Sequence, residues 1–497
     1  MNHIIIIGGG IAGLAAAYYT QKKATGTGQP IHLTVLESGS RWGGKLSTDR
    51  VDGFVIEGGP DTFLATKPWG VTLCKELGLG ERLHGTNPRQ KNTYVLHNGR
   101  LLPLPDGLAL MIPTDIPSIL KSELVSWPGK VRMGLDFLLP ARNNHADESL
   151  GSFVSRHLGR EAYENLIEPL MSGIYAGDGD RLSLTATFPY LRDMETRHGS
   201  LARGALKMRK QSVRAKHASP LQGSRSAFLT TTTGLMEIVE ALLSYLQNHS
   251  VDLRLNASVK NVKRANAKKW DVELENGEAL PADGVILAAP AFAAAKIVAA
   301  LDPQLAADLQ SIPYVSTATV SLAYRQSNLP HPLDGYGYVI PRREGRRALA
   351  CTWTSTKFPH RAPDGYALIR VFIGRAGQGI PWNESDLLAL AREELQLTLG
   401  ITAEPMISRV FLWDKAMPQY NLGHPELIKR IDAALERHPS LALAGNGYRG
   451  IGIPDCIRSG ELAVEKILNS MSLRAHFAKQ SPIQQEITSS GRTPSSQ

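Results

Sequence analysis

Three glycines near the start of the chain have the spacing of a phosphate-binding turn. Gly8, Gly10 and Gly13 follow a β-branched apolar run at residues 4–7 that predicts a buried strand, and they precede an alanine-rich run that predicts a helix. In this G-x-G-x-x-G pattern the glycines allow a tight turn, close approach of the backbone to a ligand, and close packing of the helix on the strand. The helix N-terminus then directs N–H groups at an anion, most simply a pyrophosphate. We therefore predict a dinucleotide site with the candidate residues Gly8, Gly9, Gly10, Ile11, Ala12 and Gly13.

A carboxylate ends the next predicted strand, IHLTVLE at residues 31–37. Glu37 suits the two hydroxyls of a ribose, and Ser38 follows it as a further candidate. The separation of Glu37 from Gly13 exceeds the usual spacing of about 20 residues. A longer loop at residues 24–30, ATGTGQP, accounts for the difference.

A second glycine-rich and basic segment, RWGGK at residues 41–45, comes almost directly after Glu37. Its candidate residues are Arg41, Gly44 and Lys45. A nicotinamide cofactor needs no second segment of this kind. The extended FAD molecule does, because its pyrophosphate and ribityl chain require another close approach of bare backbone. The pattern therefore favours FAD.

Composition narrows the class of protein. The chain has 497 residues, 42% of them hydrophobic, and a net charge of +9, which fits an α/β protein of roughly two or three domains. The basic residues are scattered and no RNA- or DNA-binding module is recognisable, so we expect no nucleic-acid partner. The three cysteines lack metal-ligand spacing, and we predict no metal site.

We expect a cytoplasmic protein. The chain begins directly with its first predicted strand, which leaves no room for a signal peptide, and the odd cysteine count suits a reducing compartment. The positive charge and the proline-punctuated segment 105–140 also permit a peripheral contact with a membrane.

The element pattern predicts an α/β fold with a discontinuous Rossmann-like FAD-binding domain, an α+β substrate domain and a helical subdomain. A β-α-β pattern fills the first 60 or so residues, helices dominate residues 148–178, and residues 315–415 suit an antiparallel sheet. A last strand, glycine-rich loop and helix then close the nucleotide fold that begins at residue 3. The N-terminus of that helix, near Pro454, would face the flavin ring, where its positive potential stabilises added negative charge.

These patterns give provisional domain boundaries. We assign residues 1–70, 220–300 and 435–469 to the FAD-binding domain. We assign residues 71–87, 190–219 and 301–434 to the substrate domain with its antiparallel sheet, residues 88–189 to the helical subdomain, and residues 470–497 to a disordered tail.

Longer strings carry a resemblance to a known family. R-x-G-G-(K/R) after the ribose glutamate is the pattern of the FAD-dependent amine oxidase and phytoene desaturase superfamily. Within it, the chain resembles the oxygen-dependent protoporphyrinogen/coproporphyrinogen III oxidase family, and its bacterial soluble coproporphyrinogen III oxidase branch in particular. The resemblance covers residues 3–468 and is carried by GFVIEGGPDTFLATKP (53–68), ENLIEPLMSGIYAGDGDRLSL (164–184), TWTSTKFPHRAPDG (352–365), WDKAMPQYNLGH (413–424) and GIGIPDCIRSG (450–460).

The resemblance implies roles for further residues. The loop beside the isoalloxazine ring matches Gly58, Gly59, Pro60 and Asp61, and Val262 matches a backbone position on the adenine side. Other flavin contacts match Trp413, Ile451, Gly452 and Ile453, and a loop lining the substrate cavity matches Gly173, Ile174 and Tyr175.

The resemblance also implies the chemistry. A porphyrinogen loses six hydrogens on becoming a porphyrin, in three two-electron oxidations that flavin N5 carries out, with O₂ as acceptor and hydrogen peroxide as by-product. We therefore expect non-covalent FAD, no catalytic acid or base, and transient contact with a downstream enzyme of haem biosynthesis. Coproporphyrinogen has four propionates and protoporphyrinogen two, and Lys67 is the first candidate anchor for one of them.

Other functions stay open on the sequence alone. Protoporphyrinogen IX is the main alternative substrate. An amine oxidase or a carotenoid desaturase would share the FAD motifs, and a non-catalytic FAD-binding scaffold would share them too.

Overall fold

A five-stranded parallel sheet places the N-terminal strand at its centre. In the computed structural model, which describes residues 2–28, 30–109, 112–138, 146–207, 226–266 and 269–480, all four strand pairs of this sheet are parallel. The isoleucine side chains of the central strand are buried on both faces, as expected of a parallel strand covered on both sides. The strand order is β12 (Asp252–Arg254), β2 (Ile31–Leu36), β1 (Asn2–Ile7), β16 (Gly284–Leu287) and β22 (Leu441–Leu443).

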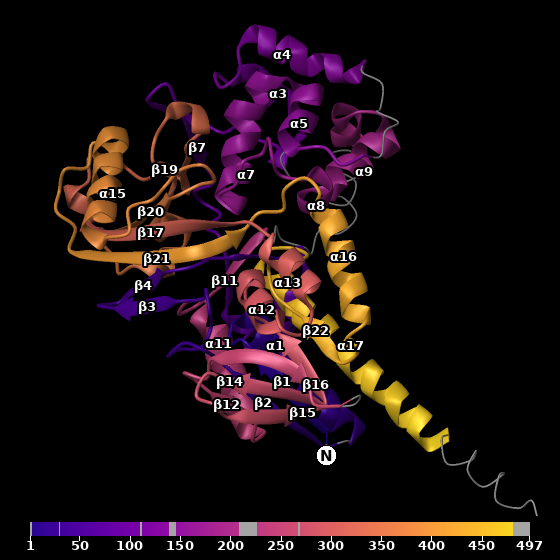
Figure 1. Ribbon diagram of the computed structural model, residues 1–497. Coiled ribbons are helices and arrows are strands. Elements are labelled where there is room, and N and C mark those ends of the chain that lie inside the picture. The colour runs from indigo at the N-terminus through magenta and orange to yellow at the C-terminus, as the bar shows by residue number, and fades with distance from the viewer. Residues whose placement is uncertain are drawn as a thin grey trace, which may run out of the picture.

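Different elements cover the two faces of this sheet (Figure 1). One face packs against the helices α1 (Ile11–Thr27), α2 (Pro68–Glu76), α11 (Met236–Asn248) and α17 (Ile453–Gln480). The other packs against the antiparallel strands β13 (Val259–Arg264), β14 (Trp270–Leu274) and β15 (Ala279–Ala282), and against the helices α12 (Ala291–Val298), α13 (Pro303–Gln310) and α16 (His424–Glu436).

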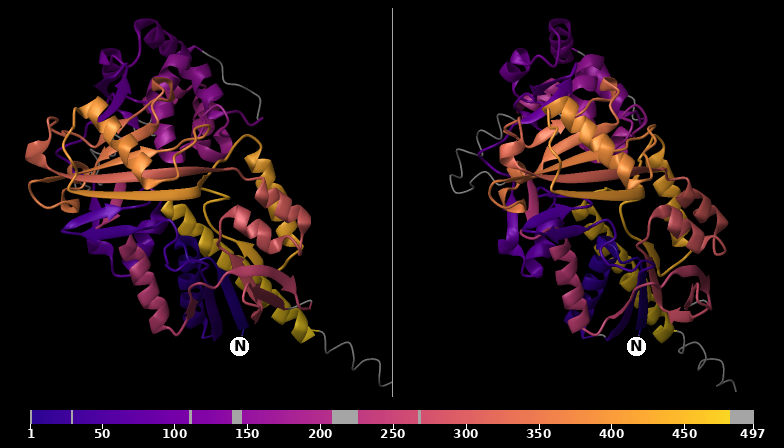
Figure 2. Two further views of the ribbon diagram at one scale, coloured as in Figure 1. Left: turned by 60° about the vertical axis from the view of Figure 1, so that its left-hand side comes forward. Right: turned by 90° about the vertical axis from the view of Figure 1, so that its left-hand side faces the viewer.

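A second, seven-stranded sheet lies between the parallel sheet and a group of helices, as the views in Figure 2 show. All its pairs are antiparallel except β18 with β7. The side chains alternate along its strands, and one face packs against α15 (Glu384–Leu399). Its order is β21 (Ile407–Pro418), β17 (Tyr314–Arg325), β20 (Tyr366–Ile373), β19 (Ala348–Trp353), β18 (Gly337–Val339), β7 (Thr93–His97) and β8 (Arg100–Pro103).

The remaining helices form a third core at the end of the molecule farthest from the N-terminus (Figure 1). They are α3 (Ile116–Lys121), α4 (Trp127–Gly134), α5 (Leu150–Leu158), α6 (Arg160–Ala162), the π-helix η3 (Tyr163–Ile167), α7 (Glu168–Tyr175), α8 (Leu184–Thr187) and α9 (Pro189–His198).

Short pieces join these layers. They are the hairpin β3 (Thr48–Val51) and β4 (Phe54–Glu57), the three-stranded sheet β5 (Phe63–Leu64), β11 (Phe228–Thr231) and β6 (Leu83–Gly85), the pair β9 (Leu108–Ala109) and β10 (Ile112–Pro113), and α14 (Thr354–Lys357).

The predicted α/β class is confirmed, while several provisional boundaries need correction. β7 and β8 belong to the seven-stranded sheet, although residues 88–103 fall within the predicted helical subdomain. α13 and most of α2 and α16 fall in ranges assigned to the substrate domain, yet all three helices pack on the parallel sheet. Buried apolar side chains, not sequence position, decide where these elements pack.

The predicted disordered tail begins too early at Ser470. α17 continues to Gln480, since Ile467, Leu468 and Met471 extend its apolar stripe over the parallel sheet. Ser470 also bonds Ser440 through its hydroxyl, at 2.8 Å between the two Oγ atoms. Residues 481–497 lie outside the described part.

Gly460 provides a test of how closely α17 packs on α1. A Cβ at Gly460 would lie 2.4 Å from the carbonyl oxygen of Ala12 and 3.0 Å from the nitrogen of Ala16. We expect Gly460→Ala to destabilise the protein by about 1–3 kcal/mol, because overpacking outweighs the gain in helix propensity. The control is Gly26→Ala, since a Cβ at this glycine of α1 meets nothing within 4 Å. It should be neutral or stabilising in urea unfolding, and equal effects of both changes would contradict the packing argument.

Candidate functional site

Two glycines of the turn from β1 into α1, Gly8 and Gly13, could not be replaced by another residue without strain or overlap. Gly8 has a φ of +117°, and a Cβ there would lie 2.7 Å from the carbonyl oxygen of Ala288. A Cβ at Gly13 would lie 1.9 Å from the carbonyl oxygen of Gly8, so α1 can approach β1 this closely only because residue 13 is glycine. Gly10, by contrast, has an open face. The backbone at the N-terminus of α1 is therefore bare on the side where an anion would bind.

Glu37 ends β2 directly beside this turn. Its Oε2 accepts the N–H of Gly9 at 2.7 Å, and its Oε1 accepts the N–H of Gly39 at 2.7 Å. Oε2 keeps a further lone pair for a ribose hydroxyl. Two backbone donors hold the carboxylate in place before any ligand arrives. The exposed Ser38 hydroxyl lies 3.3 Å from Oε1.

The RWGGK segment packs onto the same turn. Gly43 donates its N–H to the carbonyl of Gly9 at 2.9 Å, and Gly44, with a φ of +58°, lies against the Cα of Gly10. Arg41 braces the loop by donating to the carbonyls of Gly44 and Leu46. The two glycine segments therefore lie against each other at the N-terminus of α1.

Lys45 is the second cation of the RWGGK segment. Its ammonium has no hydrogen bond or ion pair among the residues that the structure describes, and burial lowers its pKa. A partly buried ammonium without a counter-ion suits a site that receives a phosphate group.

The loop at Gly58–Asp61 is held by donors from the seven-stranded sheet. The carbonyl oxygen of Gly58 accepts the hydroxyl of Thr319 at 2.9 Å, the guanidinium of Arg370 at 3.0 Å and the indole N–H of Trp413 at 2.9 Å. Gly59 lies so close to Lys45 that a Cβ would come within 1.8 Å of the carbonyl oxygen of Lys45. The half-buried Trp413 ring therefore sits beside the loop, and the sheet, the loop and the RWGGK segment meet there.

Buried charges lie behind this loop. Glu57 pairs with Arg361 at 3.2 Å, and Asp61 pairs with Lys357 at 3.1 Å. Burial alone would raise the pKa of Asp61, but Lys357 and Arg370 lower it to about 2. Asp61 is therefore a carboxylate over the physiological range, and Pro60 beside it is exposed.

The N-terminus of α17 carries the last predicted flavin contacts. Ile451, Gly452 and Ile453 lead into the helix, and Gly452 donates its N–H to Asp455 Oδ2 at 3.2 Å. Asp455 also receives Lys67, whose Nζ lies 2.7 and 2.6 Å from its two carboxylate oxygens. The structure thus gives the Lys67 ammonium a protein partner, and its role as a propionate anchor stays a prediction.

The residues predicted to line the substrate cavity lie at the end of α7. Ile174 is exposed, Gly173 borders open space, and Tyr175 is buried against Phe188 and Tyr420. The α7 end is tied to the seven-stranded sheet, because Ala376 donates its N–H to the Ala176 carbonyl at 2.7 Å. Ala176 also packs with residues of that sheet, on the face opposite α15: Val315, Val339, Ala350 and Phe372.

Two further residues bear on the predicted site, Val262 and Arg370. Val262 is fully buried in β13, and the segment beside Glu37 is 254–257, where Ala257 donates its N–H to the Glu37 carbonyl at 2.8 Å. Sequence reasoning missed Arg370, although a lone arginine inside the apolar strand YALIRVFI is itself an unusual signal.

The sequence around the predicted flavin contacts includes one cysteine, Cys456. Among the described residues there is no group of three or more histidines, cysteines or acids placed to hold a metal ion. Cys456, in the first turn of α17, is buried, and burial together with Asp455 raises the pKa of its thiol to about 12. A thiol that stays protonated is a poor nucleophile for a covalent flavin link.

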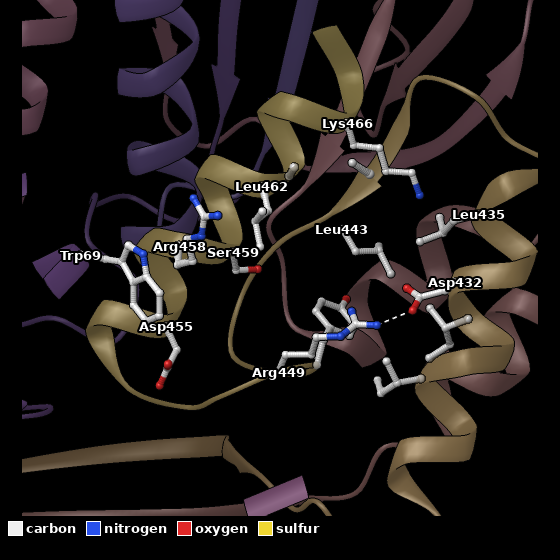
Figure 3. Close-up of a pocket in the computed structure, with 15 residues that line it drawn as sticks. Trp69, Asp432, Leu435, Leu443, Arg449, Asp455, Arg458, Ser459, Leu462 and Lys466 are labelled. Carbon is white, nitrogen blue, oxygen red and sulfur yellow. Dashed lines mark hydrogen bonds and ion pairs between the residues drawn. The ribbon is translucent and has the colours of Figure 1, made fainter. Parts of the chain in front are cut away.

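A cavity of about 260 Å³ lies between α16 and α17 at the edge strand β22. Figure 3 shows Leu435, Leu443 and Leu462 in it, with Arg449 paired to Asp432 across the rim. It reaches the N-terminus of α17 through Asp455 but includes none of the glycine segments.

Comparison with known proteins identifies the family. A family model for flavin containing amine oxidoreductases matches residues 11–468. Coproporphyrinogen III oxidase of Bacillus subtilis is 39% identical, covering 94% of this chain and 98% of that protein. The chloroplastic protoporphyrinogen oxidase 1 of Spinacia oleracea is 30% identical, covering 94% and 84%.

Solved structures agree with the sequence comparison. A protein of Exiguobacterium sp. 255-15, provisionally named a protoporphyrinogen oxidase, superposes with a TM-score of 0.80 at 33% identity, covering 94% of this chain and 98% of that chain. A reduced UDP-galactopyranose mutase shares the fold alone, with a TM-score of 0.68 at 16% identity. The bare glycine turn, the held carboxylate and the unpaired Lys45 fit an FAD molecule. This chain therefore belongs to the family of flavin containing amine oxidoreductases, and its cofactor is FAD.

Proposed function

We propose that this chain oxidises coproporphyrinogen III to coproporphyrin III, with O₂ as the electron acceptor and hydrogen peroxide as the second product. The observation that carries the proposal is the length of the likeness to the Bacillus subtilis coproporphyrinogen III oxidase, 94% of this chain. Such a match includes the seven-stranded sheet and the helices beyond the dinucleotide fold, where the substrate would bind.

The proposal assigns clear tasks to the chain. Bound FAD supplies the redox chemistry by accepting two electrons at a time from the substrate and passing them to O₂. Glu37 would hold the adenosine ribose, Lys45 and the glycine turn the pyrophosphate, and the Gly58–Asp61 loop with Trp413 the isoalloxazine ring. The apolar side chains Phe372, Ala350 and Val339 would contact the macrocycle. No side chain needs to act as an acid or base catalyst.

The substrate propionates need basic partners that are not yet identified. Lys67 is bound to Asp455 with 38% of its side chain exposed, so a propionate would have to share or displace that carboxylate. We therefore propose that Lys67 acts on the substrate indirectly, through its ion pair with Asp455 at the N-terminus of α17. Contact with a downstream enzyme of haem biosynthesis stays a prediction.

We expect Glu37→Ala to weaken FAD binding. The change leaves the Gly9 and Gly39 N–H groups without their acceptor and removes the proposed ribose acceptor, which should cost about 1–3 kcal/mol, or roughly 5- to 150-fold in Kd. Quenching of FAD fluorescence by the apo-protein measures this. Glu404→Ala is the control, since 76% of the Glu404 side chain is exposed. An unchanged Kd for Glu37→Ala would refute the ribose assignment.

The choice of substrate is tested by kinetics on the holoenzyme. We expect kcat/KM to be higher for coproporphyrinogen III than for protoporphyrinogen IX, with product formation followed by porphyrin fluorescence. A preference for protoporphyrinogen IX would establish the main alternative. Turnover of benzylamine or phytoene, with neither porphyrinogen oxidised, would instead establish an amine oxidase or a desaturase.

We also propose a cytoplasmic location with a peripheral membrane contact. An apolar stripe formed by Trp127, Val131, Leu135 and Leu138 runs along α4 and the turn after it, with exposed fractions of 67%, 64%, 44% and 78%. Exposed Ile116 and Leu120 of α3 lie beside it, because Lys130 contacts the Trp127 ring and donates to the Leu120 carbonyl. An exposed apolar stripe with Trp and Lys suits the surface of an anionic membrane. No helix in the described ranges is long and apolar enough to cross a membrane.

Vesicle binding tests this contact. The double variant Trp127→Ser/Val131→Ser should lose most of its co-sedimentation with phosphatidylglycerol vesicles, because each change removes buried apolar area at the interface. Trp382→Ser is the matched control, since Trp382 is 57% exposed at the start of the α15 region. Equal binding by native protein and the double variant would contradict the contact.

A further inference from the structure

Arg370 is a buried arginine that forms no ion pair among the described residues. Only 2% of it is exposed, and its Nη2 donates to the carbonyls of Gly58 and Gly59. Its Nε and Nη1 have no hydrogen-bond partner in the described part of the chain. A buried cation with no carboxylate within ion-pair distance is costly, because burial disfavours the charged form and lowers its pKa, and the nearby Asp61 and Glu57 carboxylates oppose that lowering.

The surrounding charges leave Arg370 in excess. Glu57 is matched by Arg361 and Asp61 by Lys357. Burial raises the pKa of Glu57, so Glu57 contributes at most one negative charge to the group. The cluster formed by Glu57, Asp61, Lys357, Arg361 and Arg370 thus carries at least one net positive charge.

The hydrogen bonds donated by Arg370 also fix the orientation of the Gly58–Gly59 peptide. The Gly58 carbonyl points at Arg370, Thr319 and Trp413. Because the peptide is trans, the N–H of Gly59 points the opposite way. That N–H has no hydrogen-bond partner within the described ranges, and Gly59 is only half buried. The positive end of this peptide is therefore free to meet a ligand.

From these observations we infer that Arg370 is a positioning residue that raises the reduction potential of bound FAD. It holds the Gly58–Gly59 peptide with its N–H toward the isoalloxazine ring, and it adds an uncompensated positive charge behind that peptide. Reduction of the ring by two electrons and one proton leaves it with one added negative charge. Positive charge and an aligned N–H favour the reduced form over the oxidised one.

This inference rests on the proposed placement of the ring beside Gly58–Asp61, and both are tested without a porphyrinogen. The midpoint potential of each holoenzyme is measured at pH 7 by reduction with xanthine and xanthine oxidase in the presence of an indicator dye. Arg370→Met should lower the equilibrium constant for two-electron reduction at least tenfold, which is a shift of about 30 mV to more negative potential. Arg370→Lys keeps the charge and should shift the potential by less than half as much.

Two further variants sharpen the comparison. Asp61→Asn removes a negative charge from the cluster and should shift the potential in the positive direction. Arg375→Met is the matched control. Like Arg370, Arg375 is a buried arginine, 1% exposed, and it donates to two carbonyls, those of Ile340 and Ala348. It lies outside the cluster. Its potential should match that of the native protein.

The outcomes separate failure of the inference from failure of the placement. Trp413→Phe should change the absorbance spectrum of bound flavin if the ring lies beside the loop, and an unchanged spectrum in both Trp413→Phe and Asp61→Asn would refute the placement. A changed spectrum with an unchanged potential in Arg370→Met would refute the inference alone. If Arg370→Met does not fold, Asp61→Asn decides, and a negative or absent shift in that variant overturns the proposal.

Discussion

The approach of α1 to β1 is the contact on which the rest of this structure depends. A Cβ on Gly13 would lie 1.9 Å from the carbonyl oxygen of Gly8, so the helix sits at a distance that only glycine permits. That distance leaves the N-terminal N–H groups of α1 bare at the carboxyl edge of the parallel sheet. α17 packs on α1 through a second glycine contact, at Gly460. The position of the α17 N-terminus therefore also depends on the close approach of α1 to β1.

Segments far apart in the chain meet around this edge. Glu37 is held by the N–H of Gly9, Gly43 donates to the Gly9 carbonyl, and Gly59 lies against Lys45. The seven-stranded sheet joins them through three donors on one carbonyl oxygen, that of Gly58. An extended ligand laid along these segments would touch backbone for most of its length and side-chain charges at few places. That arrangement suits a cofactor bound mainly through its fit to the backbone.

Local patterns made the nucleotide turn predictable, whereas long-range packing made other features unpredictable. The spacing of Gly8, Gly10 and Gly13 and the carboxylate at Glu37 follow from chemistry within one β-α-β unit, and the structure builds that unit as expected. The pairing of Lys67 with Asp455 joins residues 388 positions apart, so no local pattern could reveal it. The same is true of β7 and β8, which read as part of a helical region but complete a sheet made mostly from residues beyond 313. The end of α17 was missed because a polar composition beyond Ser470 hid its apolar stripe.

A crystal structure of the chain with FAD bound tests the central claim most directly. The account predicts the adenosine ribose at the Glu37 carboxylate, the pyrophosphate at the α1 N-terminus near Lys45, and the isoalloxazine ring against Gly59 and Trp413. An isoalloxazine ring found instead in the cavity between α16 and α17, or a ribose without contact to Glu37, would contradict it.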